Sequence, residues 1–402
     1  MKSINYLCLF LIFCAMACQP KASDAEQTDE SEAVTAGETL LFVGTYTPEE
    51  RKVDGKTSGI YVYKIDPQTA ALSLIDSING PINPSYLAFD PSERYLFAVN
   101  ELANGSADII GTLSSYRIDA VNKNFNYINT VTAAGDAPCH LITLPDSRQI
   151  VVANYVGGNI ALVPYEEDGK LITPESIIQH EGSGVNAGRQ KGPHAHMVKA
   201  FPGQAGGFVA VDLGIDQVIH YKVDETTQAL TQLTTSSVTP GAGARHLDFH
   251  PSQPWCYVLN ELNHSIEVFY YKDLSTAMER QQVISTLADT SNATAYPAAI
   301  KIHPNGKFLY ASNRGQTAEE NSIAMFSIAA ADGKLSFLGL QHTKGNFPRD
   351  FEIDPTGKHL YVANQRSDNI VVFEIDQTNG QLKDTGLEYA LPMPVCLKFL
   401  SL

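Results

Sequence analysis

A repeated pair of residues is the feature that most constrains what this chain can fold into. In five segments a proline stands nine residues before an asparagine: Pro91 and Asn100, Pro145 and Asn154, Pro251 and Asn260, Pro304 and Asn313, and Pro355 and Asn364. Pro202 and Asp212 form a sixth copy with one residue inserted, and LLFVGTY near residue 43 resembles a seventh copy without the turn. Because the copies recur about every 53 residues, repeated units must be considered before the 402 residues are divided into separate domains.

Each copy has the pattern of four short strands. An apolar strand such as YLAF, HLITL or HLDF is followed by a polar Pro/Gly turn and by a second strand that ends at the asparagine. A third strand follows in every copy, as in GIYVYKI, NIALVPY and NIVVFEI, and a fainter fourth strand such as LSLID or KLSFLGL completes the unit. The pattern predicts an all-β protein with four antiparallel strands per unit.

The arrangement of these units follows from the edges of their sheets. No helical periodicity separates the units, so radial repetition around an axis, which protects the strand edges by closing a ring, is the favoured architecture. The first unit lacks its first strand, while the C-terminal segment PVCLKFLSL is a spare strand. We therefore predict that residues 38–402 form one seven-bladed β-propeller whose first blade is closed by the C-terminal strand. A β-helix is the less favoured alternative, because its repeats are shorter and its strands pair in parallel.

Composition limits the classes of partner. An apolar fraction of 44% with 18% charged residues favours a large core over disorder. The formal net charge of -16 would repel nucleic acids and anionic membrane surfaces. We expect a monomer that binds a small molecule and no nucleic acid.

The N-terminal segment predicts export. Lys2 precedes an apolar run, Tyr6–Ala17, that is too short to span a bilayer, so residues 1–18 are predicted to be a signal peptide. Small residues before Cys18 resemble a bacterial lipoprotein signal, in which the cysteine is lipidated; an ordinary cleaved signal is the alternative. The polar residues 19–37 would form a flexible tether. The protein is expected to be periplasmic or anchored in the outer membrane, touching the membrane only through its lipid.

Three cysteines remain beyond this segment, since Cys8 and Cys14 would leave with the signal peptide. The remaining three are Cys139, Cys256 and Cys396, an odd number that cannot all form disulfides within the chain. The last two lie in apolar strand-like runs. Buried thiols are therefore expected, rather than disulfides or a nucleophile.

Aligning the repeats brings polar residues to one end of the predicted channel, because the start of each first strand lies beside the end of the next strand. The two sets of positions are Ser85, Cys139, His194, Arg245, Ala298, Arg349 and Val395, and Thr45, Glu101, Tyr155, Leu213, Glu261, Arg314 and Gln365. Arginines, glutamates and a histidine would thus meet at one mouth, where charges converging in a low dielectric bind small anions. Inter-blade ion pairs without a catalytic role are the alternative. The opposite face is expected to show no such concentration, because its turns hold ordinary Asp, Ser, Gly and Lys.

The segment GRQKGPHAHMV contains His194 and His196, which alternate along a strand and so face the same side, near Arg189 and Lys191. Two histidines without further ligands at a fixed spacing are weak evidence for zinc. A general base or a hydrogen-bond donor is favoured over a metal ligand, and we expect no metal and no cofactor. The remaining channel histidines are expected to satisfy backbone groups or turns: His140, His246 and His250.

Several segments together resemble the lactonase family of seven-bladed propellers, which includes propeller-type 6-phosphogluconolactonases and carboxy-muconate cyclase. They are LFVGTYT, GPHAHMV, GAGARHLDFHP, YVLNEL, YPAAIKIHPNGKFLYASNRG and GNFPRDFEIDPTGKHLYVANQ. The resemblance implies an active site made of a histidine, two arginines and a glutamate. These would be His194 or His196, together with Arg245, Glu261 and Arg314.

The resemblance implies a carboxylic-ester hydrolase that opens a cyclic ester with water. Arg245 and Arg314 would stabilise the oxyanion, and Glu261 or one of the two histidines would take the proton from water. Arg349 would hold a carboxylate or phosphate of the substrate. Two further channel residues are expected to contact the substrate: Glu101 and Gln365.

The resemblance implies a 6-phosphogluconolactonase-like activity, but the predicted export does not suit a phosphorylated cytoplasmic substrate. Either the substrate is an unphosphorylated sugar lactone or another lactone outside the cytoplasm, or the activity has diverged from that of the family. Two other functions stay open, since fold does not dictate function. One is a non-catalytic propeller that binds a sugar or a protein, and the other is a lyase or isomerase that closes the ring.

Overall fold

The computed structural model describes residues 37–48, 56–103, 111–119, 122, 124–145, 147–174, 176–224, 226–288, 295–317 and 320–402. The predicted signal peptide, Cys18 and the tether up to residue 36 lie outside the described residues. Within the described part of the chain, no helix has the length and apolarity needed to cross a membrane.

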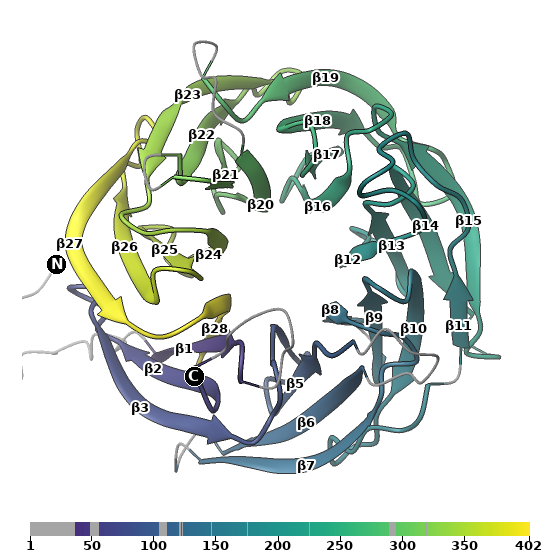
Figure 1. The fold of residues 1–402 in the computed structure, drawn as a ribbon, viewed down its shortest axis with the longest axis horizontal. Helices are drawn as coiled ribbons and strands as arrows, with labels where there is room; N and C mark the ends of the chain where they lie inside the picture. Colours follow the sequence, from purple (N-terminus) through teal and green to yellow (C-terminus); the bar gives the residue numbers. More distant parts are fainter. Residues whose placement is uncertain are drawn as a thin grey trace, which may run out of the picture. The chain divides into compact units, whose positions relative to one another are not determined.

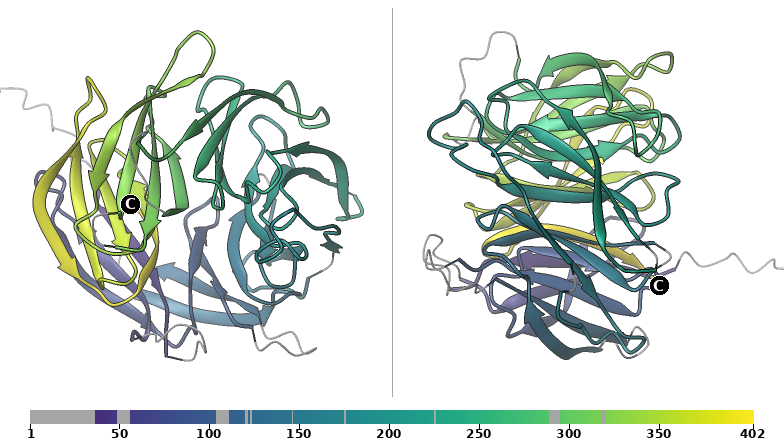
Figure 2. Two further views of the ribbon diagram at one scale, coloured as in Figure 1. Left: turned by 45° about the horizontal axis from the view of Figure 1, so that its top comes forward. Right: turned by 90° about the vertical axis from the view of Figure 1, so that its right-hand side faces the viewer.

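Seven four-stranded antiparallel sheets surround a common axis, seen along the axis in Figure 1 and from the side in Figure 2. This confirms the seven-bladed propeller. From the innermost to the outermost strand, the sheets are β28 (Pro394–Ser401), β1 (Thr39–Thr45), β2 (Gly59–Ile65) and β3 (Leu72–Asn79); β4 (Tyr86–Phe89), β5 (Tyr95–Asn100), β6 (Thr112–Asp119) and β7 (Asn124–Thr132); β8 (Pro138–Thr143), β9 (Gln149–Asn154), β10 (Asn159–Pro164) and β11 (Ser176–Gln179); β12 (Ala195–Ala200), β13 (Gly207–Asp212), β14 (Gln217–Val223) and β15 (Leu230–Ser237); β16 (Ala244–Phe249), β17 (Trp255–Asn260), β18 (Ser265–Tyr270) and β19 (Glu279–Ser285); β20 (Ala295–Ile302), β21 (Phe308–Gly315), β22 (Ser322–Ile328) and β23 (Leu335–His342); and β24 (Pro348–Ile353), β25 (His359–Asn364), β26 (Asn369–Ile375) and β27 (Leu382–Ala390).

The ring is closed by the two ends of the described chain. Strand β28 pairs antiparallel with β1 along its whole length, from Thr39 opposite Ser401 to Thr45 opposite Pro394. The C-terminal strand therefore supplies the innermost strand of the first blade, as predicted. Without β28 the first blade would have only three strands, and β1 would be its inner edge strand.

The core lies between neighbouring blades rather than inside any one sheet. Leu41 and Val43 of β1, for example, share one apolar cluster with Tyr361 of β25 and Ile370 of β26 in the adjacent blade. The second strand of most blades is buried on both faces, which explains its continuous apolar run. Outer strands such as β7 and β19 are largely exposed on one face, so their sequence signal is faint.

The repeated asparagine has a structural role. The Nδ2 of Asn154 donates to the carbonyl of Ala133, at 3.0 Å, and the Nδ2 of Asn313 donates to the carbonyl of Thr286 at the same distance. Each acceptor belongs to the segment that enters the blade from the preceding one. The asparagine thus fixes the junction between blades, where a buried backbone carbonyl needs a donor.

Candidate active site

Bulges at the start of the inner strands bring polar side chains together at one end of the ring. In β8, β12, β16 and β24 the pairing with the next strand skips one residue, and these extra residues are Cys139, His196, Arg245 and Arg349. A bulge re-aims the side chain that it releases from the regular pleat. The same local irregularity in several blades therefore produces one cluster.

The register corrects two positions of the predicted ring. In the blade of β12 the residue equivalent to Arg245 is His196 and not His194, because Ala195 pairs with Asp212 as Ala244 pairs with Asn260. In the first blade, Thr45 pairs with Pro394 and so occupies the position of the asparagine. The residue that follows it is therefore the one equivalent to Glu101, namely Tyr46.

The centre of the site is a carboxylate held by three arginines, which we call the Arg–Glu cluster: Arg189, Arg245, Glu261 and Arg314. Nη2 of Arg189 donates to Oε1 of Glu261 at 2.8 Å, and Nη2 of Arg314 donates to Oε2 at 2.6 Å. Nε of Arg245 lies 2.9 Å from the same Oε2, but the geometry is not that of a hydrogen bond, so this contact is an ion pair only.

Burial and charge set the protonation of this cluster. Burial alone would raise the pKa of Glu261, but the charges of Arg314, Arg245 and Arg189 outweigh it and hold that pKa far below its ordinary value. Burial, and then the charge of Arg314, lower the pKa of Arg245, although a guanidinium stays protonated at neutral pH. Glu261 is therefore an anion that organises the arginines, and it is a weak proton acceptor.

The guanidinium groups are also fixed from outside the cluster. Nη1 of Arg245 donates to the carbonyl of Ala298 in the next blade. Nε of Arg314 donates to the carbonyl of Tyr296 at 2.8 Å, and its guanidinium lies 5.0 Å from the ring centre of Phe347. Several contacts per guanidinium leave the positive charges little freedom to move.

A second ion pair lies beside the Arg–Glu cluster. Nη2 of Arg349 is 3.5 Å from Oε2 of Glu101, and the hydroxyl of Tyr46 donates to that same oxygen at 2.9 Å. Although burial opposes it, the fields of Tyr46 and Glu101 raise the pKa of Arg349. Two of the predicted substrate-binding residues thus contact each other.

The third predicted substrate-binding residue is Gln365. Its side chain is buried, and within the described part of the chain its Oε1 has no hydrogen-bond partner. A buried amide oxygen without a donor costs free energy that a bound hydroxyl group would recover.

The two predicted histidines both contact the ring of Tyr155. The ring of His194 stacks on that of Tyr155 with centres 4.6 Å apart, and the ring of His196 meets it edge-on at 5.2 Å. Nδ1 of His194 is 2.9 Å from the carbonyl of Tyr155. Because a carbonyl only accepts, Nδ1 carries the proton and Nε2 carries the lone pair in the neutral ring.

His196 is more deeply buried than His194 and has a different environment. Burial and the charge of Arg245 lower its pKa well below the ordinary value, so it is neutral. Its carbonyl accepts from the thiol of Cys139 at 3.4 Å. Burial raises the pKa of that thiol, so Cys139 is no nucleophile, and the three cysteines are free and buried as expected.

Three residues of this site received no functional role from the sequence: Tyr46, Tyr155 and Arg189. Tyr46 was displaced by the one-residue register error, and Tyr155 was aligned at the mouth without a role. Arg189 was noticed only as a neighbour of the histidines, because it lies in the long connection before β12 and outside the repeat. Its side chain is bound by the hydroxyl of Tyr155 at 3.0 Å as well as by Glu261.

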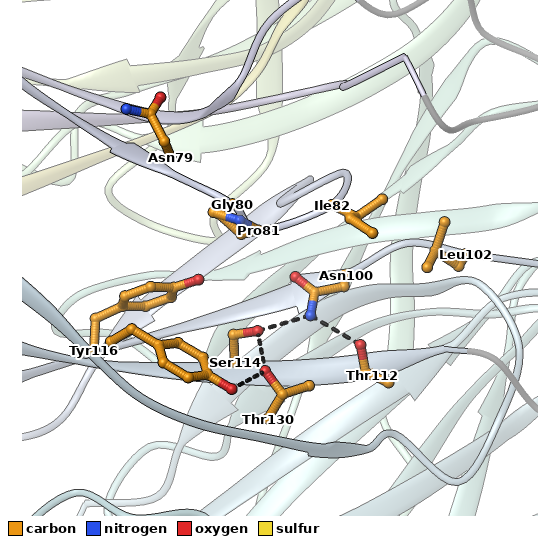
Figure 3. A pocket seen from close by; sticks show the side chains of 11 residues that line it. Asn79, Gly80, Pro81, Ile82, Asn100, Leu102, Thr112, Ser114, Tyr116 and Thr130 are labelled. Atoms are coloured by element: carbon orange, nitrogen blue, oxygen red, sulfur yellow. Dashed lines mark hydrogen bonds between the residues drawn. The ribbon is translucent and has the colours of Figure 1, made fainter.

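A pocket of about 490 Å³ outside the ring axis does not suit this chemistry. Figure 3 shows its lining, which comes from the second blade, the last residue of β3 and the connection after β3; Ser114 is hydrogen-bonded to both Asn100 and Thr130. Tyrosines are the only titratable side chains among its lining residues. Since ester hydrolysis needs a base and a group that stabilises negative charge, we place the candidate active site at the Arg–Glu cluster.

No group of three or more His, Cys, Asp or Glu side chains within the described ranges is arranged to hold a metal ion. The chemistry available at the cluster is that of fixed positive charge beside imidazole and phenol groups.

The protein is a seven-bladed β-propeller with a cluster of three arginines and one glutamate at one end of its inner strands. Residues 40–399 match the model of the family described as Lactonase, 7-bladed beta-propeller. The chain therefore belongs to this lactonase family, and the resemblance seen in the sequence is confirmed.

Named relatives point the same way. The chain is 34% identical over 359 residues to a 6-phosphogluconolactonase of Bacillus subtilis (strain 168), covering 89% of this chain and 97% of the relative. It is 30% identical to a 6-phosphogluconolactonase of Formosa agariphila, covering 85% and 94%. Its fold matches the structure of the periplasmic gluconolactonase of Pseudomonas aeruginosa with a TM-score of 0.82 and 30% identity, covering 90% and 99%. Family and relatives together support a lactonase-like function.

Proposed function

We propose that the protein is a lactone hydrolase that opens a sugar lactone with water at the Arg–Glu cluster. The observation that carries this proposal is the carboxylate of Glu261 bound by three guanidinium groups. Three positive charges against one negative charge leave an excess of two. The protein holds this excess positive charge in a fixed position. An oxyanion that forms beside it would be stabilised without any reorganisation of water.

The reaction needs one proton acceptor and one group that stabilises negative charge. Water adds to the lactone carbonyl as it gives a proton to the base, and the carbonyl oxygen becomes an oxyanion facing Arg245 and Arg314. The bond between the carbonyl carbon and the ring oxygen then breaks, and the ring oxygen takes the proton. The product is a hydroxy acid, which ionises.

We assign the base to His194. Its Nδ1–H is held by the carbonyl of Tyr155, so Nε2 has the lone pair that accepts a proton, and its ring is less buried than that of His196. In many enzymes a catalytic histidine is likewise held in one tautomer by a hydrogen bond to another group, which here is the carbonyl of Tyr155. Glu261 is a poor candidate because its three arginines stabilise the ionised form.

We propose an unphosphorylated sugar lactone as the substrate. The predicted signal peptide would place the protein outside the cytoplasm, and the fold neighbour from Pseudomonas aeruginosa is a periplasmic gluconolactonase. Arg349 and Gln365 would contact the hydroxyl groups or an acidic group of the sugar. The relatives named 6-phosphogluconolactonase make the phosphorylated lactone the alternative to test.

The test is a panel of δ-lactones of aldoses with and without a 6-phosphate, with the spontaneous opening rate subtracted. We expect His194→Gln to lower kcat by about 100-fold or more, as for loss of a general base, and His196→Gln to lower it less. Glu374→Gln, an exposed control, should not change the rate. Opening no faster than the uncatalysed rate across the panel would leave the non-catalytic propeller, and net ring closure from the hydroxy acid would favour the lyase.

A further inference from the structure

A central cavity lies on the far side of the bulges from the Arg–Glu cluster. Its volume is about 380 Å³, and residues from all seven inner strands line it. A cavity of this size can hold a ligand as large as a monosaccharide. The proposed hydrolysis does not use it.

Polar side chains gather here, so the expectation that this end has no concentration of them was wrong. Three lysines from three blades line the cavity: Lys199 of β12, Lys301 of β20 and Lys398 of β28. They lie on the inner strands themselves, whereas the expectation rested on the residues of the turns.

The lysines outnumber the carboxylates that they contact. Lys199 pairs with Asp248 at 2.8 Å, but Lys301 and Lys398 share Glu352, at 2.7 and 3.8 Å. Three more carboxylates line the cavity: Asp90, Glu93 and Asp350. Glu93 is exposed to solvent, whereas Asp90 and Asp350 are buried and accept from backbone N–H groups at 2.6 and 3.0 Å. Burial raises the pKa of Asp350.

Two uncharged donors face the same space. Nζ of Lys398 donates to the hydroxyl of Tyr86 at 3.1 Å, so that hydroxyl keeps its own proton for another acceptor. The Nδ1 of His140 accepts from the backbone N–H of Val198 at 3.5 Å, which places the ring proton on Nε2.

That Nε2–H of His140 is the second, independent sign of a ligand. The side chain is 2% exposed, lines the cavity and, within the described part of the chain, has no partner at Nε2. A buried donor without an acceptor is costly, and an acceptor bound in the cavity would satisfy it. The ammonium, phenol and imidazole groups come from separate blades and are all hydrogen-bond donors. A ligand that binds them together must therefore carry several acceptor oxygens.

We propose that the cavity is a binding site for a small oxyanion of the carboxylate or phosphate type, held by Lys301, Lys398, Tyr86 and His140. The site is separate from the Arg–Glu cluster. His246 connects the two sites: it lines the cavity, and its Nε2 accepts from Nη1 of Arg245 at 3.3 Å.

The test is isothermal titration of the purified full chain with gluconate and, separately, with inorganic phosphate. Lys398→Met should weaken binding by about tenfold or more, the effect of losing one charge-assisted hydrogen bond, while Lys398→Arg should retain most of the affinity. Lys301 still pairs with Glu352 in both variants, so the fold should survive, as checked by circular dichroism. His140→Phe keeps an aromatic ring in contact with Tyr86 and should also weaken binding.

Arg314→Met separates this cavity from the Arg–Glu cluster, since both carry positive charge. The proposal requires oxyanion binding that Arg314→Met leaves intact and Lys398→Met weakens. Binding of gluconate alone would make the site a carboxylate site, and binding of phosphate alone a phosphate site. Failure of both anions to bind, or binding that Lys398→Met leaves unchanged, would overturn it.

Discussion

Replacing Glu261 by glutamine should destabilise the protein more than any exposed carboxylate replacement. The amide keeps the shape of the side chain but removes the charge that faces three guanidinium groups. The side chains of Arg245 and Arg314 are only 2% and 7% exposed, so water cannot replace the lost counter-ion.

The size of the effect follows from burial. Removing one partner of a buried ion pair costs about 3–5 kcal/mol in the free energy of unfolding, because the other charge stays buried and uncompensated. Arg189 adds little to this figure, since its side chain is 39% exposed and screened by solvent. For a domain of this size the melting temperature should fall by roughly 4–7 °C, from the usual entropy of unfolding per residue.

The destabilisation should also depend on pH. The pKa of Glu261 is lower in the folded state than in the unfolded chain, so its ionised form stabilises the fold above the ordinary glutamate pKa of about 4.3. That contribution disappears as the pH falls from there toward the folded-state pKa. The difference between the wild type and Glu261→Gln should thus be constant near neutral pH and shrink in acid.

Urea unfolding at pH 7.5 and at pH 4 measures both effects. Glu374→Gln is the matched control, because the pair of Glu374 with Lys383 is 3.7 Å long and the side chains are 55% and 79% exposed. It should change the free energy of unfolding by less than about 1 kcal/mol. Equal stabilities of the two variants at pH 7.5 would refute the view that Glu261 holds the arginines together.

Three further outcomes are expected. Arg314→Met should lower kcat by about 10²–10³-fold, the effect of losing a preorganised oxyanion donor, whereas Arg366→Met, which removes the other arginine on the same Phe347 ring, should not; equal rates would exclude the oxyanion role. Asn364→Ala should cost about 1–3 kcal/mol in urea unfolding by removing the donor to a blade-junction carbonyl, while the exposed Asn379→Ala should be nearly neutral. The buried thiols of Cys139, Cys256 and Cys396 should react with iodoacetamide at pH 8 only after the protein is unfolded, as measured by mass spectrometry.

The repeat predicted the fold because its conserved spacing has a physical cause within the chain itself. The Pro/Gly turn sets the hairpin, and the asparagine nine residues later binds the incoming segment of the preceding blade. Both are local demands of one blade, so they recur wherever a blade recurs. The outer strands were harder to see, because one exposed face removes most of their apolar pattern.

The site was predicted less completely because its geometry depends on register. Arg245, Glu261, Arg314 and Arg349 were placed at one end from strand alignment alone, and the structure brings the first three into direct contact. A bulge adds one residue without a sequence signature that could be counted, so His194 was aligned where His196 stands.

Other contacts could not be predicted from the repeat at all, namely those of Arg189 and those of the lysines in the central cavity. Arg189 reaches Glu261 from 72 positions earlier in the chain, through a connection outside the repeat. The lysines occupy inner-strand positions that only the closed ring brings together. Such convergence is a property of the tertiary fold, which no single repeat encodes.

The bulges explain how one repeated scaffold can hold a site without symmetry. The equivalent extra residue is a thiol, an imidazole or a guanidinium in different blades, at Cys139, His196, Arg245 and Arg349. In the blade of β20 small alanines occupy the same place, and the carbonyl of Ala298 accepts from Arg245 of the neighbouring blade. A side chain that leaves the regular pleat can therefore change without disturbing the apolar contacts between blades. A substitution of Arg245 or Arg349 instead breaks an ion pair near the axis. Substitutions of the buried Glu261 and its arginines should therefore lower the stability of the molecule most.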